Sequence, residues 1–224
     1  MRYEEVKRGI FQSRPNRFIA QVELEGRIET AHVKNTGRCR ELLLPNASVY
    51  LARGTNPNRR TAWDLIAVEK GTRLVNMDSQ APNAVAAEAM DRLFPQATLV
   101  RREHFFGRSR FDFSVETAEK RSFIEVKGVT LERNGAVFFP DAPTERGVKH
   151  LRELIQCREA GYEACLLFVI QMRGVSFCSP NDDTDPAFGE ALREAAAKGV
   201  RILAYDCFVT PEELRLGDPV EVRL

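Results

Sequence analysis

The 224-residue sequence predicts a small β-barrel followed by an α/β domain with a mixed sheet. Short β-type segments without any helical pattern fill residues 17–79. An Ala-rich helical pattern then begins at Pro82, and strands and helices alternate over the rest of the chain. We therefore divide the chain into a first domain over residues 1–80 and a second domain over residues 81–224.

The first domain is expected to be a closed barrel of five short strands. Closure pairs the strand edges that an open sheet of so few strands leaves exposed. The first two strands form a hairpin that turns at Glu25-Gly26. The five segments are RFIAQVELEG (17–26), RIETAHVKN (27–35), ASVYLAR (47–53), TAWDLIAVEKG (61–71) and TRLVNMDS (72–79).

The second domain is expected to open with a helix, PNAVAAEAMDRLF (82–94), because Pro82 suits a first helical turn. Two later strands are almost wholly apolar, as strands covered on both faces should be, and helices precede them, which predicts parallel pairing. The expected strands are 98–106, 108–117, 121–132, 136–140, 163–172 and 201–209, and the expected later helices are 143–160, closed by Gly161, and 185–199.

Composition excludes several protein classes. No segment approaches the roughly 20 apolar residues of a membrane span, and the start lacks the apolar core of a signal peptide. Five cysteines without paired spacing argue against a disulfide framework and a Cys₄ zinc site. We expect Cys165, Cys178 and Cys207 to be buried reduced thiols, and the protein to be cytoplasmic with no membrane partner.

Charge is unevenly distributed along the chain. Residues 1–80 carry 14 Lys and Arg against 9 Asp and Glu, whereas residues 81–224 carry 19 against 23. A basic first domain fits a nucleic-acid-binding module attached to a second unit. An ordinary uneven surface explains the same numbers, and on charge alone we favour that interpretation.

A candidate catalytic site lies in the predicted strands around FIEVKGVTLE (123–132). Strand alternation places Phe111, Phe113 and Val115 on one face and Asp112 on the other. Glu125 and Lys127 share one face of the next strand, so Asp112, Glu125 and Lys127 converge if the two strands pair as a hairpin. The alternative is a solvated strand face with alternating charges, which is the better interpretation of an E-x-K triplet alone.

Two carboxylates from adjacent strands form a hard oxygen site suited to Mg²⁺ or Mn²⁺. The main-chain carbonyl of Val126, between the two charged residues, is a candidate third ligand. Lys127 could orient the attacking water and stabilise charge on a phosphoryl oxygen. Glu103, on the preceding strand, and Glu88, on the first helix, are candidates for an additional acid.

The long helix predicted over 143–160 begins with further polar groups, Thr144, Arg146, Lys149 and His150. Part of this set could face a cleft, and arginine can bind a phosphate through two parallel hydrogen bonds. The alternatives are a surface charge for Arg146 and a half-buried histidine for His150, and without context we favour these.

In the predicted barrel, a turn at residues 35–38 could hold a phosphate through backbone amides and an arginine. Barrels of this kind bind single strands by combining a basic groove with aromatic platforms. The aromatics Phe11, Phe18, Tyr50 and Trp63 are equally explained as core residues, which we favour. The basic residues are Arg14, Arg17, Lys34, Arg38, Arg40, Arg53, Arg59 and Arg60.

The order of the second domain's residues resembles the PD-(D/E)XK nuclease superfamily, with Arg110-Phe111-Asp112 standing where that superfamily has Pro-Asp. The whole chain resembles the sugar fermentation stimulation protein family of bacteria and archaea. One departure is Asn46, where the family commonly has glycine, and asparagine tolerates a left-handed turn. The matching stretches are SRPNRFIAQV, AHVKNTGR, PNAVA, GRSRFDF, IEVKGVTL, FPDAPTERGVKHLREL and DPAF.

This resemblance implies an OB-fold-like barrel followed by a PD-(D/E)XK nuclease-like domain, non-specific DNA binding, and a proposed regulatory link to sugar use. It implies Asp112 and Glu125 as metal-holding acids, Lys127 as the catalytic lysine, and Glu88 or Glu103 as an accessory acid. The residues that we then expect to contact nucleic acid are Arg17, Lys34, Asn35, Thr36, Arg38, Arg40, Arg110, Thr144, Arg146, Lys149 and His150.

Two functions are compatible with these residues. The first is a Mg²⁺- or Mn²⁺-dependent nuclease that hydrolyses phosphodiester bonds, and the second is a DNA-binding regulator without turnover. An enzyme of sugar or nucleotide metabolism is a distant third, because the chain has no G-x-G-x-x-G or G-x-x-x-x-G-K-[ST] phosphate loop.

Overall fold

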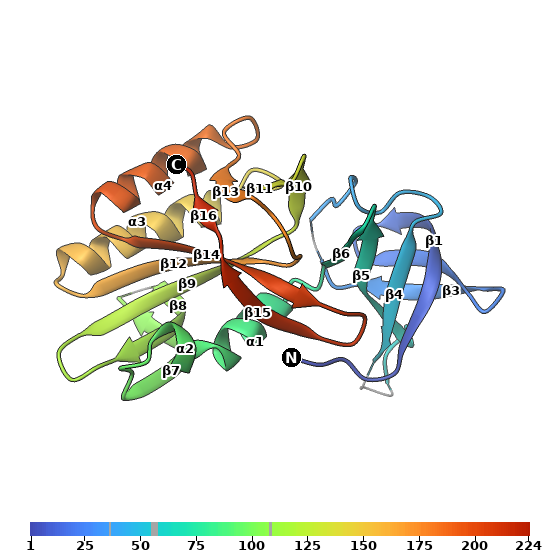
Figure 1. Cartoon of the computed structure of the whole chain (residues 1–224), viewed down its shortest axis with the longest axis horizontal. Coiled ribbons are helices and arrows are strands. Elements are labelled where there is room, and N and C mark those ends of the chain that lie inside the picture. Colours follow the sequence, from blue (N-terminus) through green and yellow to red (C-terminus); the bar gives the residue numbers. More distant parts are fainter. Residues whose placement is uncertain (36, 55–57, 108) are drawn as a thin grey trace.

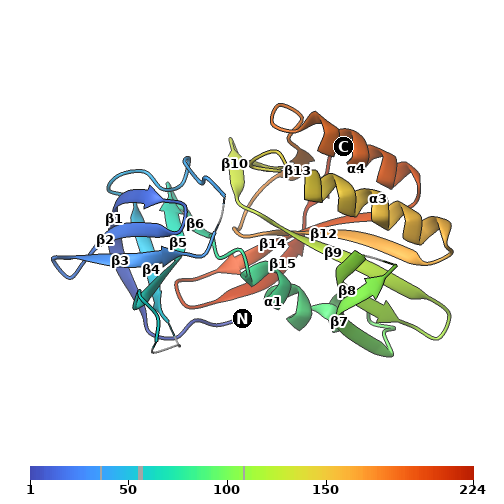
Figure 2. The same cartoon turned by 180° about the vertical axis from the view of Figure 1, so that it is seen from behind.

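The computed structural model describes residues 1–35, 37–54, 58–107 and 109–224. Six strands at the start of the chain form a five-stranded barrel with one attached strand, at the right of Figure 1, and the rest of the chain forms an α/β unit at the left. Figure 2 shows the same arrangement from behind.

The barrel is closed by a parallel pairing between two strands that are not neighbours in sequence. The strand order is β3-β2-β1-β4-β5-β6, and the β3–β5 pairing completes a ring of five strands, with β6 attached outside it. The closed barrel expected from the sequence is confirmed. The ring strands are β1 (Val6–Asn16), β2 (Ile19–Leu24), β3 (Arg27–Val33), β4 (Ser48–Arg53) and β5 (Trp63–Lys70), and the attached strand is β6 (Arg73–Asn76).

The strand assignment from sequence was wrong at β1, because the expected barrel began at residue 17, and the expected fifth strand over 72–79 is β6, which lies outside the ring. The pairing of β1 with β2 shifts register between Phe11 and Ser13 and again before Asn16, which interrupts the alternation that identifies a strand. Gly9 is a second reason why β1 was missed, because glycine is unfavourable inside a strand. A Cβ at Gly9 would lie 2.6 Å from Val22, so the glycine is needed for close approach of β1 and β2.

The second domain is built on a six-stranded mixed sheet with the order β15-β14-β12-β9-β8-β7. The three central strands β9, β12 and β14 are parallel, as the alternation of apolar strands and helices predicted, and the outer pairings are antiparallel. The strands are β7 (Leu99–Phe106), β8 (Ser109–Glu116), β9 (Arg121–Val129), β12 (Glu163–Ile170), β14 (Arg201–Val209) and β15 (Leu214–Pro219).

Helices cover both faces of this sheet (Figure 1). On one face α3 (Glu145–Glu159) and α4 (Pro186–Ala197) pack over a core that includes Leu151 and Phe123. On the other face α1 (Ala81–Glu88) and α2 (Met90–Leu93) pack over a core that includes Val85 and Val126. The sheet therefore separates two apolar layers, and residues that alternate along β9 face different helices.

A second, four-stranded sheet has the order β10-β11-β13-β16. Three strands of the domain, β13, β15 and β16, were not expected from the sequence, and β16 comprises only two residues. The strands of this small sheet are β10 (Leu131–Arg133), β11 (Ala136–Phe139), β13 (Phe177–Pro180) and β16 (Glu221–Val222).

All five cysteines are buried and free, which confirms the expectation for Cys165, Cys178 and Cys207. Asn46 has φ +67°, the left-handed turn conformation that asparagine was expected to tolerate. In the described part of the chain, none of the helices combines the length and the apolar character that crossing a membrane requires.

Candidate active site and nucleic-acid interface

Asp112 is held between β9 and helix α1. Strands β8 and β9 pair antiparallel, and the recorded register ends with Phe113 opposite Ile124, one residue from Asp112 and from Glu125. One carboxylate oxygen of Asp112 accepts a hydrogen bond from the Val126 amide at 2.8 Å, and the other accepts from the Asn83 side chain at 2.8 Å. The hairpin predicted from sequence is present. It brings Asp112 close enough to Glu125 for the charge of Glu125 to affect the pKa of Asp112.

Glu125 is buried, with 3% of the residue exposed. Its Oε1 accepts a hydrogen bond from Lys127 Nζ at 2.6 Å and another from His150 Nδ1 on helix α3. Its Oε2 is buried and has no hydrogen-bond partner among the described residues. A buried carboxylate oxygen without a partner is costly, so this atom needs a ligand that the protein does not itself supply.

The hydrogen bonds of His150 define its tautomer. Arg146 Nε donates to His150 Nε2 at 3.4 Å, and a guanidinium can only donate. Nε2 is therefore the accepting nitrogen, and Nδ1 carries the proton that Glu125 accepts. His150 is only 8% exposed, so it contacts Glu125 from the protein interior. Arg146 is exposed at the surface.

The two carboxylates have pKa values shifted in opposite directions. Burial, together with the nearby charge of Glu125, raises the pKa of Asp112. Burial also acts to raise the pKa of Glu125, but the hydrogen bond from His150 and the charge and hydrogen bond of Lys127 outweigh it and lower that pKa. Neighbouring carboxylates with diverging pKa values are typical of functional sites.

The expectation that Phe111, Phe113 and Val115 share one face is wrong. The ring of Phe111 lies 5.6 Å from that of Phe123 in the core under α3, whereas Phe113 and Val115 lie in the core under α1. The alternation is broken at Asp112. Opposite it on β7, Glu103 adopts φ +52°, and no register pair is formed there.

The residues present fit a hard divalent cation. Asp112 and Glu125 offer carboxylate oxygens, Glu125 Oε2 lacks a partner, and each Asp112 oxygen accepts one hydrogen bond and keeps a lone pair. Within the described residues no group of three His, Cys, Asp or Glu side chains is arranged around a metal position. Mg²⁺ commonly takes only one or two carboxylates and completes its shell with water and substrate phosphate.

Neither predicted accessory acid joins the hydrogen-bond network of Asp112 and Glu125 among the described residues. Glu88 is exposed and pairs with the N-terminal ammonium of Met1 at 2.6 Å. Glu103 is exposed and pairs with Arg110 at 3.5 Å. Asn83 takes the place beside Asp112, and it was not predicted from the sequence although it lies within the family-like stretch PNAVA.

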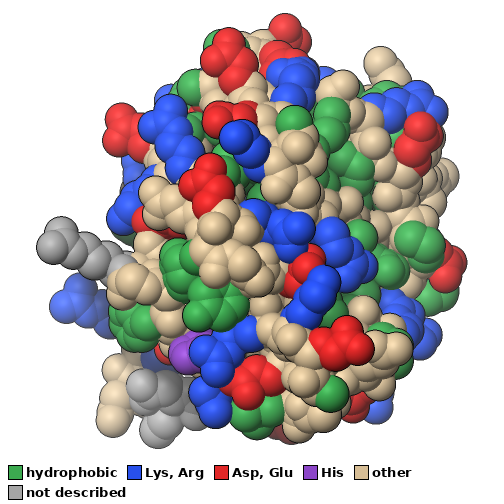
Figure 3. Space-filling view, turned by 90° about the vertical axis from the view of Figure 1, so that its left-hand side faces the viewer, with side chains coloured by type: hydrophobic (Ala, Val, Ile, Leu, Met, Phe, Trp, Pro, Cys, Tyr) green, Lys and Arg blue, Asp and Glu red, His purple; other side chains and the backbone are tan. Residues whose placement is uncertain are grey.

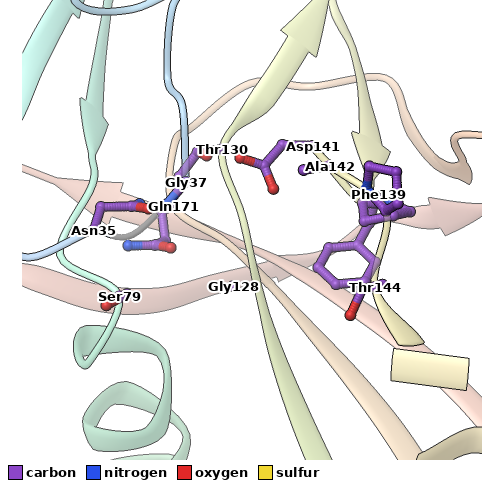
Figure 4. A pocket seen from close by; sticks show the side chains of 12 residues that line it. Asn35, Gly37, Ser79, Gly128, Thr130, Phe139, Asp141, Ala142, Thr144 and Gln171 are labelled. Atoms are coloured by element: carbon purple, nitrogen blue, oxygen red, sulfur yellow. Dashed lines mark hydrogen bonds between the residues drawn. The ribbon is translucent and has the colours of Figure 1, made fainter. Parts of the chain in front are cut away.

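A cavity of about 320 Å³ lies next to this site, between the barrel and the second domain (Figure 4). Asn35 and Ser79 approach it from one side, and Asp141 and Thr144 from the other. Gly128, which follows Lys127, also lines it, and a Cβ there would lie 2.6 Å from the side chains of Gln171 and Pro82. The stretches containing Asn35, Lys127 and Thr144, far apart in sequence, therefore meet around one cavity.

Four polar residues of this cavity were not predicted as site residues, although Thr130 and Asp141 lie in the family-like stretches IEVKGVTL and FPDAPTERGVKHLREL: Ser79, Thr130, Asp141 and Gln171. Gln171 donates to Asn76 Oδ1 at 2.8 Å, so it joins the second domain to the end of the barrel. Partial desolvation raises the pKa of Asp141, which lines the cavity although the residue as a whole is exposed.

A second cavity, of about 330 Å³, lies on the barrel and is lined by arginines. Arg14 has a structural role, because its guanidinium donates to the main-chain carbonyls of Arg17, Asn35, Gly37 and Arg38. The lining residues are Arg14, Asn16, Arg17, Gly37, Arg38, Arg40 and Leu43.

Two family models match the chain, one for each part. Residues 13–77 match the model described as the SfsA N-terminal OB domain, and residues 80–213 match the Sugar fermentation stimulation protein RE domain. The chain belongs to the sugar fermentation stimulation protein family. The first part is therefore an OB domain, and the second is an α/β domain with mixed sheets.

Members of this family match over the full length of the chain. The homolog from Desulfitobacterium hafniense (strain Y51) is 52% identical, with 100% of this chain and 99% of the relative covered. The homolog from Ruminiclostridium cellulolyticum is 54% identical, with full coverage of both. The solved structure of Pyrococcus furiosus SfsA in complex with Ca²⁺ superposes with a TM-score of 0.87 at 28% identity, covering 100% of this chain and 98% of that one.

The remaining residues expected to contact nucleic acid lie at several places. Thr144 lines the interdomain cavity and caps helix α3, because its side chain accepts from the Gly147 amide at 3.0 Å. Lys149 is exposed and lies 3.6 Å from Glu153. Lys34 forms an ion pair with buried Asp78 at 2.7 Å. Thr36 lies outside the described residues.

Proposed function

We propose that this protein binds DNA without sequence specificity and hydrolyses phosphodiester bonds with Mg²⁺ or Mn²⁺ held by Asp112 and Glu125. The observation that carries the proposal is the buried, unpartnered Oε2 of Glu125 close to Asp112, with Lys127 Nζ 2.6 Å from the other oxygen of Glu125. The order Asp112, Glu125, Lys127 on paired strands also supports a likeness to the PD-(D/E)XK nucleases. The Ca²⁺ complex of the Pyrococcus furiosus protein supports a divalent-cation site in the family.

The chain's own residues have separate roles in this proposal. Asp112 and Glu125 would hold the cation, while His150 and Lys127 fix the orientation of Glu125. The ammonium of Lys127 has three N–H donors, so donors remain for a water or a phosphoryl oxygen. Arg146, exposed beside His150, would bind the phosphate.

When bound, the cation would supply positive charge to a phosphoryl oxygen and make water a stronger nucleophile. Whether Val126 contributes its carbonyl as a ligand stays a prediction. The Val126 amide already orients Asp112 at 2.8 Å, so the peptide contributes to the site through at least that bond.

A DNA-binding regulator without turnover is the second candidate. It is favoured by the small number of acids at the site, since Glu88 and Glu103 form ion pairs elsewhere. The link to sugar use that the family name suggests belongs to this candidate.

Cleavage of DNA tests the proposal. Purified protein should cut linear, nicked or single-stranded DNA with Mn²⁺ and leave it intact with EDTA. Lys127→Ala should lower the rate by about 100-fold or more, the effect of losing a group that assists proton transfer. Lys198→Ala, at the exposed end of α4, is the matched control. Cleavage undiminished in Lys127→Ala would contradict the catalytic assignment, and DNA binding without any cleavage would favour the regulator.

A further inference from the structure

The arginine-lined cavity on the barrel and the cavity beside the candidate active site share one residue, Gly37. A Cβ at Gly37 would lie 2.5 Å from the carboxylate of Asp141 and 2.8 Å from the side chain of Asn35. Glycine at this position therefore allows the barrel loop to approach Asp141 and the Asn35 side chain closely. The position of Gly37 makes the two cavities neighbouring sections of one surface.

The barrel cavity carries positive charge that the protein does not neutralise. Arg17, Arg38 and Arg40 are exposed, and none has a carboxylate partner in the described part of the chain. Other exposed cations do have partners, such as Arg193 with Asp182 and Lys120 with Glu163. Three unpaired guanidinium groups around one cavity suit the phosphates of a polynucleotide.

The opposite end of the molecule has a different surface. Figure 3 views the second domain from its end, and Lys and Arg side chains there are interleaved with Asp and Glu. The ion pairs Lys120–Glu163, Arg158–Glu163 and Arg121–Glu116 belong to this domain. Exposed cations without a carboxylate partner in the described residues also occur singly elsewhere, such as Arg27 and Lys198. The barrel cavity differs because three of them line one hollow.

An exposed aromatic ring adjoins the basic cavity in sequence. Phe18 is 51% exposed, whereas Phe11 and Trp63 are buried and the Tyr50 hydroxyl is bonded to Glu69. The Phe18 amide donates to Asn16 Oδ1 at 2.9 Å, and Asn16 lines the cavity. Exposure of a phenylalanine costs hydrophobic free energy, and a stacked base would recover it.

We propose that a single-stranded polynucleotide follows this surface, with its phosphates on Arg17, Arg38 and Arg40, a base on Phe18, and the strand passing Gly37 into the cavity beside Gly128. The inference rests on the DNA-binding part of the proposed function and names its substrate class. A duplex does not fit this arrangement, because its bases are stacked on one another and offer no free face to Phe18.

The polar lining of the interdomain cavity suits base edges. Asp141 accepts hydrogen bonds, as the exocyclic amine of cytosine would require, and Thr130 and Gln171 provide further polar groups. Phosphates would be repelled by Asp141 and attracted by the arginines. The strand would thus present its backbone to the barrel cavity and its bases to the interdomain cavity.

Fluorescence anisotropy with EDTA present tests the binding step separately from cleavage. A labelled single-stranded oligonucleotide should bind at least tenfold more tightly than the same sequence as a duplex. Phe18→Ala should weaken single-strand binding by roughly 5- to 150-fold, the effect of one lost stacking contact. Ile28→Ala is the matched control, because Ile28 is 59% exposed on the barrel outside both cavities.

The arginines are tested by the salt dependence of binding. Each of Arg17→Ala, Arg38→Ala and Arg40→Ala should reduce the slope of log K against log salt by about 0.7. Arg27→Ala, exposed on the barrel outside both cavities, should leave the slope unchanged. Equal affinity for single strand and duplex, or full affinity in Phe18→Ala, would overturn the inference without affecting the cleavage proposal.

Photocrosslinking tests the path across Gly37. A benzophenone amino acid in place of Phe18 or of Ser79, which is exposed and lines the interdomain cavity, should crosslink to the same single strand at different nucleotides. Crosslinks from position 18 alone would show that the strand leaves the protein before the interdomain cavity, which would overturn the path. Crosslinking and binding in EDTA need no turnover, so a protein that fails to cut DNA can still pass these tests.

Discussion

At the scale of single residues, the candidate site is defined by the unequal environments of two carboxylates. Glu125 has two donors on one oxygen and none on the other, while Asp112 has one donor on each oxygen. Lys127 and His150 together offset the cost of burying Glu125. Among the described residues, no Lys or Arg side chain donates a hydrogen bond to Asp112, whereas Lys127 donates one to Glu125. The negative charge of Asp112 is therefore less well compensated than that of Glu125.

Asp112→Asn keeps one acceptor for the Val126 amide, and rotation of the Asn83 amide supplies an acceptor for the new NH₂ group, so the substitution should stabilise the metal-free protein at neutral pH. The pKa of Asp112 is raised in the fold by burial and by Glu125, so its ionised form opposes folding, and that cost disappears as pH falls and the group is protonated. An increase of about 2–4 °C in Tm corresponds to ~1 kcal/mol for a protein of this size. Scanning calorimetry at several pH values, with EDTA, measures the difference.

Glu125→Gln provides the comparison in the same experiment. The pKa of Glu125 is lowered in the fold because His150 and Lys127 outweigh its burial, so its charge contributes stability that is lost as pH falls through its folded pKa. The substitution should therefore lower Tm. A lower Tm in Asp112→Asn at neutral pH would contradict the claim that the ionised Asp112 carboxylate destabilises the fold.

At the scale of secondary-structure elements, the sequence predicted those strands and helices that have a regular pattern of apolar residues. The strands β12 and β14 were found from their apolar runs, and the helix α3 from its spacing and Gly161. The approach of Asp112 to Glu125 was also predicted, because a hairpin leaves few alternatives. Elements that depend on irregular pairing were not found, above all β1 with its register shifts.

The errors within the site have the same origin. The break in alternation at Asp112 moves Phe111 to the other core, and no local signal in residues 109–116 announces it. Asn83 and Asp141 enter the site through the packing of α1 and of the segment before α3, which depends on contacts between distant segments. Such contacts are absent from any sequence window, so the sequence could propose the acids but not their neighbours.

At the scale of the whole molecule, the interdomain cavity exists because the two domains are joined by polar contacts. Glu132 of β10 is buried and binds Lys70 of β5 at 2.7 Å, with Arg73 of β6 at 3.4 Å. Residues at the chain start add a second connection, since the Tyr3 amide donates to the Glu212 carbonyl at 2.8 Å. The proposed strand path requires these connections, because it uses both domains.

Glu132→Gln should loosen the barrel from the second domain. Burial acts to raise the pKa of Glu132, but Lys70, the Gly135 amide and Arg73 outweigh it and lower that pKa, so its charge stabilises the fold and this contribution is lost as pH falls. The expected loss is about 1–3 kcal/mol, because Lys70 and Arg73 are partly exposed and screened by solvent.

Denaturant unfolding at neutral and acidic pH measures this loss, and Glu221→Gln, whose ion pair with Arg223 is exposed, is the control. A Glu132→Gln protein as stable as the parent at neutral pH would show that this ion pair does not join the domains.

Calorimetric titration of the metal-free protein with Mn²⁺ is the decisive measurement for the proposed metal site. We expect saturable binding that weakens at least tenfold in Asp112→Asn and in Glu125→Gln, and that persists in Glu88→Gln, since Glu88 pairs with the chain's N-terminus instead. Binding of the same strength in Asp112→Asn and Glu125→Gln as in the parent would contradict the assignment of these two carboxylates as the metal site.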